Sequence, residues 1–429
     1  MRTYRSSRLT PAQRRSLTIR NRANDQSAAT AVRGICLAVK KRGNSAVREF
    51  SRRFDGIAPR IQPLPASALI KARRGMPPPF LRALRIAAAN IARFHRDRMG
   101  PQRPVRTMPG VKCWRTVTPI SRVGLYVPAG SAPLPSTVLM LGIPALLAGC
   151  RSIVLFTPPM PDGSANPFIL AAAAVAGIKQ VVPVGGAQAI AAMAYGTQSI
   201  PKVDKIFGPG NKFVDMAKQF VAADPDGCAV DMPAGPSELL VISDGTANPA
   251  FVAADLLSQA EHDPDARVAL VTTSELLAEH VQRELGRQLG SLPRKSIAKR
   301  SLEAGFVLIV PSLSEAVRFS NDYAPEHLSL QIASPKKFAA LIQNAGSVFL
   351  GSFSPVAAGD YASGTNHTLP TGGAARVFSG ISVASFQKSV SFQSLSRNGL
   401  NRLSNTIKTI AVAEGLEAHR QAVIAREQQ

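Results

Sequence analysis

The chain has 429 residues, of which 45% are hydrophobic and 18% charged, a composition that is typical of globular proteins and excludes a largely disordered chain. Lys and Arg number 51 against 27 Asp and Glu, so the formal net charge is +24. The charge is uneven, because residues 1–100 hold 23 basic and 4 acidic side chains, whereas residues 101–429 hold 28 and 23. At this length the sequence predicts two or three domains.

Cysteine usage and hydropathy exclude further classes. None of the four cysteines forms a CxxC pair, which excludes a cysteine zinc site, argues against a disulfide framework and favours a reducing compartment. The most apolar run, residues 138–149, is broken by Gly142 and Pro144 and is too short to span a bilayer. We therefore expect a cytoplasmic protein with no membrane partner.

The basic N-terminus allows two other interpretations. The first 22 residues contain seven arginines and no acid, as organelle presequences do, although no small-residue cleavage site follows. A strongly basic arm is also typical of proteins that bind nucleic acid or anionic membranes. Residues 1–100 contain only five aromatic side chains, however, which is few for stacking bases.

Residues 9–100 are predicted to be helical, with basic outer faces. Apolar residues recur at helical spacing in 34–42 and 44–54, and the second run ends at the turn signal Asp55-Gly56. Residues 83–94 are expected to form another helix.

After Pro119, short β-rich runs alternate with helix-like runs, which predicts βαβ units and parallel sheets. The first series has strands at 123–127, 152–156, 180–184 and 205–207 and helices at 139–148, 168–176 and 187–195. The second has strands at 239–243, 267–272, 306–310, 328–332 and 347–350 and helices at 251–261, 275–289, 313–321 and 335–344. From Val390 the chain is expected to be helical to its end.

Two glycine-rich turns follow predicted strands in the first series. The segments GGAQ at 185–188 and GPGN at 208–211 each lead from a strand into a helix, where backbone N–H groups can bind an anion. Neither completes the dinucleotide fingerprint, and Phe213 stands where the third glycine of the second turn would be. Taken singly, each is also explained as a tight turn in an α/β sheet.

Two histidine-containing pairs could carry chemistry. Gln259 and His262 are three residues apart, so on a helix they would share one face, as metal ligands often do, although such a pair is common by chance. Glu326 and His327 are adjacent beside an apolar strand and could form an acid–base pair or a surface charge pair at a turn.

A polar loop at 359–367 contains Asp360, a candidate metal ligand, and His367. Loops of this kind at strand ends are usually functional in α/β folds. The other histidines of interest lie on helices and are, taken singly, expected to be solvated: His95, His280 and His419.

Taken together, six motifs resemble the histidinol dehydrogenase family in order and spacing. They are VGGAQAIA at 184–191, KIFGPGN at 205–211, DMPAGPSE at 231–238, SQAEH at 258–262, PEH at 325–327 and GDYASGTNH at 359–367. The similarity runs from about Leu9 to the last helix, which leaves little room for a removable leader.

The resemblance implies a zinc-dependent, NAD-linked oxidation of L-histidinol to L-histidine, through an enzyme-held L-histidinaldehyde, at the end of histidine biosynthesis. It implies one Zn²⁺ per subunit, which would hold the imidazole and amine of the substrate without redox work of its own. NAD would carry the hydride in each of two transfers, so the protein supplies positioning and proton transfer.

Residue roles are carried over from the resemblance, position by position. Glu326 would activate the water that hydrates the aldehyde, and His327 would be the base in the hydride-transfer steps. The implied zinc ligands are Gln259, His262, Asp360 and, from the partner subunit of a homodimer, His419. The implied substrate-binding residues are Ser237, Gln259, His262, His327, Asp360, His367, Glu414 and His419. The implied NAD-binding residues are Tyr126, Gln188 and Asn211.

One departure from the family pattern falls next to the implied nucleotide site. In the segment YVPAG at 126–130, Ala129 stands where the family typically has glycine, which could crowd the nucleotide if the backbone approaches it closely.

The implied fold is two incomplete Rossmann-like α/β domains with parallel sheets, plus small N- and C-terminal helical segments. Residues 1–24 would form the N-terminal segment. Residues 25–125 with 238–378 would form the domain that carries zinc and the catalytic residues, and 126–237 the NAD-binding domain. Residues 379–429 would form a tail exchanged in the dimer.

Two rival functions are weighed against this one. A family relative could oxidise another small alcohol, such as a sulfonated diol, although Glu414 and His419 favour histidinol. A nucleic-acid-binding protein would use residues 1–100, but their charge lies outside every catalytic cluster. We interpret it as a solvated surface with no specific nucleic-acid partner.

Overall fold

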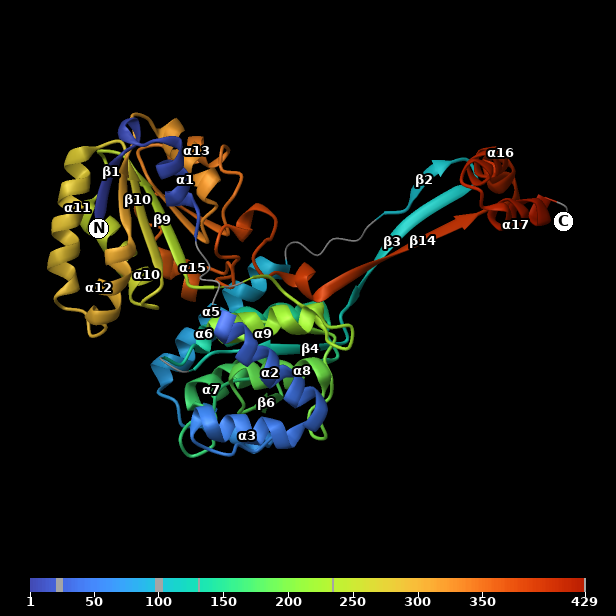
Figure 1. Cartoon of the computed structure of the whole chain (residues 1–429), viewed down its shortest axis with the longest axis horizontal. Coiled ribbons are helices and arrows are strands. Elements are labelled where there is room, and N and C mark those ends of the chain that lie inside the picture. The colour runs from blue at the N-terminus through green and yellow to red at the C-terminus, as the bar shows by residue number, and fades with distance from the viewer. Residues whose placement is uncertain (21–25, 97–102, 130–131, 234, 428–429) are drawn as a thin grey trace. The chain divides into compact units, whose positions relative to one another are not determined.

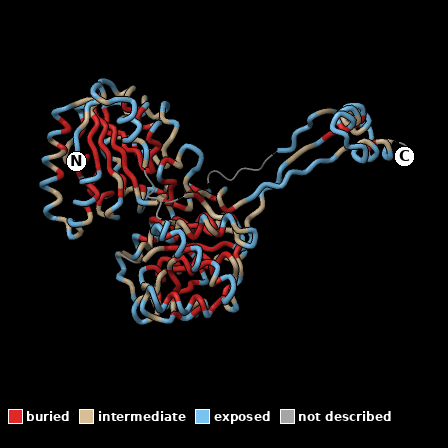
Figure 2. Tube along the Cα trace, viewed as in Figure 1, coloured by how far each residue is buried: buried red, intermediate tan, exposed pale blue. Residues whose placement is uncertain are grey.

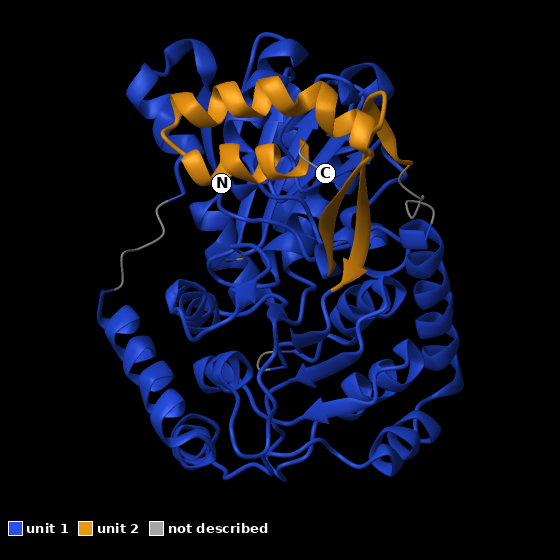
Figure 3. Ribbon diagram, turned by 90° about the vertical axis from the view of Figure 1, so that its right-hand side faces the viewer, with its two compact units in different colours: residues 1–96, 120–386 blue, residues 97–119, 387–429 orange. Residues whose placement is uncertain are grey.

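The computed structural model describes residues 1–20, 26–96, 103–129, 132–233 and 235–427. The chain divides into two compact units, unit 1 with Met1–Arg96 and Ile120–Phe386, and unit 2 with Asp97–Pro119 and Gln387–Gln429 (Figure 3). Unit 1 contains two parallel sheets covered by helices (Figure 1), which confirms the predicted α/β class. No helix in the described part of the chain is long and apolar enough to cross a membrane.

The inner strands of both parallel sheets are buried along most of their length and mainly apolar, as strands covered on both faces require (Figure 2). The six-stranded sheet has the order β1 (Arg2–Arg5), β11 (Phe306–Ile309), β10 (Arg267–Thr272), β9 (Glu238–Ser243), β12 (His327–Gln331) and β13 (Ser347–Leu350). The five-stranded sheet has the order β6 (Gln180–Val182), β5 (Ser152–Phe156), β4 (Arg122–Tyr126), β7 (Lys205–Phe207) and β8 (Ala229–Val230).

Alternate residues of β9 point to opposite faces of the six-stranded sheet and enter two separate cores. Leu239 and Val241 pack with α10 (Pro249–Ala260), α11 (Glu275–Leu289) and α12 (Lys295–Ala304). Leu240 and Ile242 pack with α13 (Leu313–Tyr323) and, less deeply, with α1 (Pro11–Thr18). Two short helices, α14 (Pro335–Ala339) and α15 (Val356–Tyr361), and the 3-10 helices η1 (Ser6–Arg8) and η2 (Ala374–Arg376) also occur in unit 1. A third 3-10 helix, η3 (Val383–Phe386), packs in a core of the five-stranded sheet.

The five-stranded sheet is also covered on both faces. One core joins Val154 to α2 (Gln26–Arg42), α3 (Asn44–Asp55), α8 (Gly186–Tyr195) and α9 (Lys212–Ala223). The other joins Leu155 to α4 (Ala66–Arg74), α5 (Pro78–Arg96), α6 (Pro135–Ala148) and α7 (Pro167–Ala176). These contacts group α2–α5 with the five-stranded sheet, whereas residues 25–125 were expected in the domain of the zinc and catalytic residues.

Unit 2 is a small antiparallel sheet with two helices. The strands have the order β14 (Gln387–Leu395), β3 (Val111–Pro119) and β2 (Val105–Met108), and the helices are α16 (Arg397–Ala413) and α17 (Glu417–Glu427). The prediction of helix from Val390 onward is therefore wrong for the first six residues. β14 is held by pairing with β3, 268 to 284 residues earlier, where Phe392 faces Trp114 with their rings stacked 5.4 Å apart.

One histidine differs from its predicted environment. His95 is only 4% exposed on α5, so the prediction that it is solvated is wrong. Burial lowers the pKa of its imidazole. The helical periodicity of α5 continues through Ile91 to His95, four residues later, which places the ring on the buried face.

Candidate active site

The centre of the candidate site lies at the amino end of β12, where Glu326 and His327 are 5% and 4% exposed. The neighbouring strand β9 runs parallel, and its first residue, Glu238, binds both side chains through its backbone. The N–H of Glu238 donates to Oε2 of Glu326 at 2.7 Å, and Nδ1 of His327 donates to its carbonyl oxygen at 3.1 Å. The two side chains form a buried pair, with 3.5 Å between Oε2 of Glu326 and Nδ1 of His327.

The pKa values of both side chains of the pair differ from their ordinary values. Burial raises the pKa of Glu326, because it disfavours the charged carboxylate. Burial alone would lower the pKa of His327, but the carboxylates of Glu326 and Asp360 outweigh it and raise that pKa well above its ordinary value. Such perturbed pairs are typical of proton-transfer sites.

Asp360 approaches the pair from α15. Its Oδ1 lies 3.5 Å from Nε2 of His327, and its backbone carbonyl oxygen accepts a hydrogen bond of 2.8 Å from Nδ1 of His367. Burial lowers the pKa of His367, and its Nε2 is hydrogen-bonded to the Thr137 hydroxyl at 3.0 Å. The structure therefore places Asp360 and His367 beside the Glu326–His327 pair.

Gln259 and His262 lie at and just beyond the end of α10. Gln259 is 2% exposed, and its Oε1 is a buried acceptor without a hydrogen-bond partner. His262 is exposed, yet the protein around it lowers the pKa of its imidazole, and it is close enough to Asp360 and His327 for their charges to act on it. In the described part of the chain, no group of three His, Cys, Asp or Glu side chains is already arranged as a metal site.

A buried carboxylate, which the sequence did not single out, binds the start of α15, the helix that carries Asp360. Asp255 lies one helical turn before Gln259 on α10 and is buried. Its carboxylate accepts from Nε2 of Gln331 at 2.8 Å and from the backbone N–H of Val356, the first residue of α15. Burial raises the pKa of Asp255 to about 6. The spacing of Asp255 and Gln259 on one helix face was the available signal.

The three residues predicted to bind NAD lie around the five-stranded sheet. Tyr126 ends β4, is 3% exposed, and accepts from the N–H of Gly186 through its hydroxyl at 3.1 Å. Gln188, 1% exposed, lies 3.5 Å from Asp55 through its Nε2. Asn211 is exposed and caps α9, its Oδ1 accepting from two backbone N–H groups at 3.1 Å. Each therefore has a structural contact of its own.

A buried ion pair, which the sequence did not single out, binds the backbone of the turn after β7. Lys218 and Asp231 are paired, with side chains 3% and 2% exposed. Lys218 donates to the carbonyl oxygen of Gly208 at 3.0 Å, and the N–H of Gly208 donates to Asp231 at 2.7 Å. Gly208 has φ of 121°, and a Cβ there would lie 2.1 Å from the carbonyl oxygen of Tyr126, so glycine is required.

The remaining predicted residues fall in two places. Ser237 directly precedes Glu238, and its carbonyl oxygen accepts from the N–H of Arg267 at 2.9 Å. Glu414 is the C-cap of α16, and His419 lies on α17. Both residues are exposed and belong to unit 2, whereas the other predicted site residues belong to unit 1. Gly130 and Ala234, from two of the segments used above, lie outside the described residues.

Comparison with known proteins decides the family. The family model described as histidinol dehydrogenase matches residues 18–427. The chain belongs to the histidinol dehydrogenase family. It is 52% identical over 396 residues to histidinol dehydrogenase of Xanthomonas euvesicatoria pv. vesicatoria, covering 92% of each chain. It is 51% identical over 417 residues to that of Xylella fastidiosa strain Temecula1, covering 97% of this chain and 96% of the relative.

A solved structure supports the same assignment. The crystal structure of histidinol dehydrogenase from Elizabethkingia anophelis superposes with a TM-score of 0.95 at 45% identity, and the match covers 100% of this chain and 98% of that one. The resemblance inferred from the six histidinol dehydrogenase motifs is therefore confirmed.

Proposed function

We propose that this chain oxidises L-histidinol to L-histidine through L-histidinaldehyde, with NAD as the hydride acceptor and one Zn²⁺ per subunit. The observation that carries the proposal is the placement of two carboxylates on the buried ring of His327, that of Glu326 3.5 Å from Nδ1 and that of Asp360 3.5 Å from Nε2. An alcohol oxidation needs a proton acceptor beside the departing hydride, and a buried histidine flanked by carboxylates supplies one.

The donor set fits zinc. Gln259 offers a buried oxygen without a partner, Asp360 a carboxylate and His262 an imidazole, and oxygen and nitrogen atoms of these kinds are zinc ligands. His419 of the partner subunit is the proposed fourth ligand. When bound, zinc would hold the substrate's imidazole and amine and polarise the oxygen that reacts.

The chain's own residues divide the proton transfers. Because the carbonyl oxygen of Glu238 can only accept, Nδ1 of His327 carries the donated hydrogen and Nε2 is the atom that faces the substrate side. His327 takes the hydroxyl proton as the first hydride leaves to NAD. His327 then releases this proton to solvent, and Glu326 deprotonates the water that adds to the aldehyde. His327, neutral again, takes a hydroxyl proton of the hydrate as the second hydride leaves to a second NAD. Ser237, His367 and Glu414 are the proposed further substrate contacts.

The NAD site is proposed on the two glycine turns of the five-stranded sheet. Gly185 and Gly186 open α8, and Gly208 lies in the turn before α9, where N–H groups and the helix N-terminus favour a phosphate. Tyr126, Gln188 and Asn211 surround these turns, as described above. Ala129 follows β4 and is half-buried. Any crowding of the nucleotide by its methyl group would raise KM for NAD.

A homodimer is proposed from the exposed apolar side chains of unit 2. Several of its apolar side chains are exposed: Val105, Val117, Val390, Phe392, Ile410, Val412 and Leu416. A unit this small buries little apolar surface of its own and gains stability from a second copy. Mixing His419→Ala chains with His327→Ala chains should then restore activity, because a hybrid dimer has one intact site. No recovery in demonstrated hybrids would contradict the shared site.

A cytoplasmic location is proposed from the thiols, since Cys36, Cys113, Cys150 and Cys228 are all free. We also propose that the basic N-terminal region has no specific nucleic-acid partner. Weak binding to DNA that disappears steeply as salt rises would agree with this, whereas retention at physiological salt would contradict it.

The function is tested by metal analysis and steady-state NAD reduction on one protein preparation. We expect one zinc per subunit and NAD reduction with L-histidinol, lost on chelation and restored by Zn²⁺. A zinc-loaded protein that ignores L-histidinol but oxidises a sulfonated diol would instead assign it the rival substrate.

A further inference from the structure

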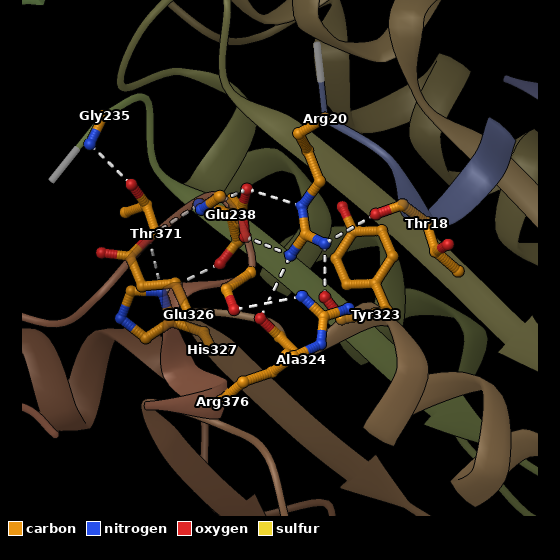
Figure 4. Close-up of polar contacts among 12 residues, drawn as sticks. Thr18, Arg20, Gly235, Glu238, Tyr323, Ala324, Glu326, His327, Thr371 and Arg376 are labelled. Carbon is orange, nitrogen blue, oxygen red and sulfur yellow. Dashed lines mark hydrogen bonds and ion pairs between the residues drawn. The ribbon is translucent and has the colours of Figure 1, made fainter. Parts of the chain in front are cut away.

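A buried ion pair lies directly behind the catalytic pair (Figure 4). Arg20 and Glu238 have side chains that are 7% and 3% exposed. The guanidinium binds the carboxylate with two parallel hydrogen bonds, Nε to Oε1 at 2.8 Å and Nη2 to Oε2 at 2.7 Å. This two-pronged geometry fixes the orientation of both groups as well as their separation.

Arg20 also holds the turn that delivers the catalytic pair to the site. Its guanidinium donates to the carbonyl oxygens of Tyr323 and Ala324, the latter at 3.1 Å, and its Cζ lies 3.6 Å from the centroid of the Tyr323 ring. Ala324 has φ of 50°, and among the described residues it is the one non-glycine residue with positive φ. Two residues later the chain reaches Glu326, so the strained turn sets where β12 begins.

Glu238 links the ion pair to the chemistry by a second route. Its side chain is held by Arg20 and by the N–H of Gly372, which donates to Oε1 at 3.0 Å. Its backbone N–H and carbonyl oxygen bind Glu326 and His327 as described above. Arg20 therefore acts on the pair from both sides, through the start of β9 and through the turn before β12.

We propose that Arg20 is a positioning residue that sets the relative placement of Glu326 and His327 through Glu238 and the carbonyl oxygens of the Tyr323–Ala324 turn. The inference rests on the proposed function. Stability alone does not explain a charged pair at this depth, because replacing a buried ion pair with apolar groups is often neutral or stabilising. Geometry does explain it, since the loss of a group that orients catalytic residues commonly lowers activity about 10- to 100-fold.

The test compares three variants with the wild-type enzyme. Arg20→Ala removes the guanidinium. The double variant Arg20→Met with Glu238→Gln removes both charges, so that no buried charge is left unpaired. Arg14→Met is the matched control, because Arg14 also joins the N-terminal segment to α13, through Glu315 at 3.4 Å, away from the catalytic pair.

We expect kcat to fall about 10- to 100-fold in Arg20→Ala and in the double variant, while KM for L-histidinol and zinc content stay within about two-fold. Arg14→Met should keep kcat within about two-fold of wild type. A cavity of about 230 Å³ lies beside Arg20 and Tyr323. Added guanidinium ion should therefore enter Arg20→Ala and restore part of kcat, which it would not do for a general loss of stability.

Two results would overturn the proposal. One is a kcat within two-fold of wild type in both Arg20 variants. The other is an equal loss in Arg14→Met that follows the melting temperature. If wild type itself does not oxidise L-histidinol, the proposed function fails, and the positioning is then read from crystal structures. Unchanged positions of Glu326 and His327 in the double variant would overturn it, and displaced ones would support it.

Discussion

Nδ1 of His327 lies 3.1 Å from the backbone carbonyl oxygen of Glu238. A carbonyl oxygen accepts only, so this contact keeps a hydrogen on Nδ1, and the proton that His327 releases and takes up is the one on Nε2. The same residue's N–H binds Glu326 at 2.7 Å, so the backbone of one residue at the start of β9 orients both members of the proposed catalytic pair.

An asparagine at position 327 should separate the structural contact from the chemistry. The side-chain amide of His327→Asn can still donate to Glu238 but cannot accept a proton. We expect kcat to fall about 10²- to 10⁴-fold, the usual contribution of a general base. The melting temperature and zinc content should stay near wild type. Rapid turnover by this variant, measured by NADH absorbance, would show that another group is the base.

Gln259→Leu should affect metal binding and apo-protein stability in opposite directions. Oε1 of Gln259 is buried without a partner, so replacing it with an apolar group of similar size removes an unsatisfied acceptor. We expect the metal-free variant to gain up to about 1–3 kcal/mol in unfolding free energy. Zinc content, measured by elemental analysis after dialysis, should fall well below one per subunit. A variant that retains full zinc would contradict the role of Gln259 as a ligand.

The turn after β7 should not tolerate a side chain at Gly208. In Gly208→Ala the alanine would have to adopt the φ of 121° that Gly208 has, with its Cβ 2.1 Å from the carbonyl oxygen of Tyr126. The backbone conformation alone costs about 1–3 kcal/mol. We therefore expect a lower melting temperature and a raised KM for NAD. Gly34→Ala is the matched control, because Gly34 lies within α2 with nothing within 4 Å of the added Cβ, and it should be neutral or stabilising.

The cysteines should be unreactive in the native protein, with one exception. Burial raises the pKa of Cys36 and of Cys228 to about 12 and that of Cys150 to about 11. At pH 8 roughly one in a thousand Cys150 thiols, and fewer of the other two, would be ionised. Their reaction with a disulfide reagent should quicken about tenfold for each pH unit. One fast thiol, that of Cys113, is expected, and it should be lost in Cys113→Ser. Any fast thiol that remains in that variant would contradict this.

The alternation of strands and helices in unit 1 could be predicted because each element carries its own pattern. The predicted strands at 205–207 and 267–272 match β7 and β10. The unit 2 strand β14 could not, because its residues adopt a strand only by pairing with β3 far earlier in the chain. Sequence patterns report local structure, whereas such pairings depend on the whole fold.

The candidate site divides in the same way. Glu326, His327 and Asp360 were identifiable because they lie in motifs that resemble a known family. Arg20 was not, because its partner Glu238 is 218 residues away and no local spacing connects them. General rules also favoured the carboxyl ends of parallel strands, yet the catalytic pair lies at the amino end of β12.

The most direct test of the proposed chemistry is product stoichiometry with limiting L-histidinol and excess NAD. Two hydride transfers and one hydration should give two NADH and one L-histidine for each L-histidinol consumed, with no free aldehyde released. One NADH per L-histidinol, with histidinaldehyde as the final product, would contradict the four-electron oxidation at the Glu326–His327 pair.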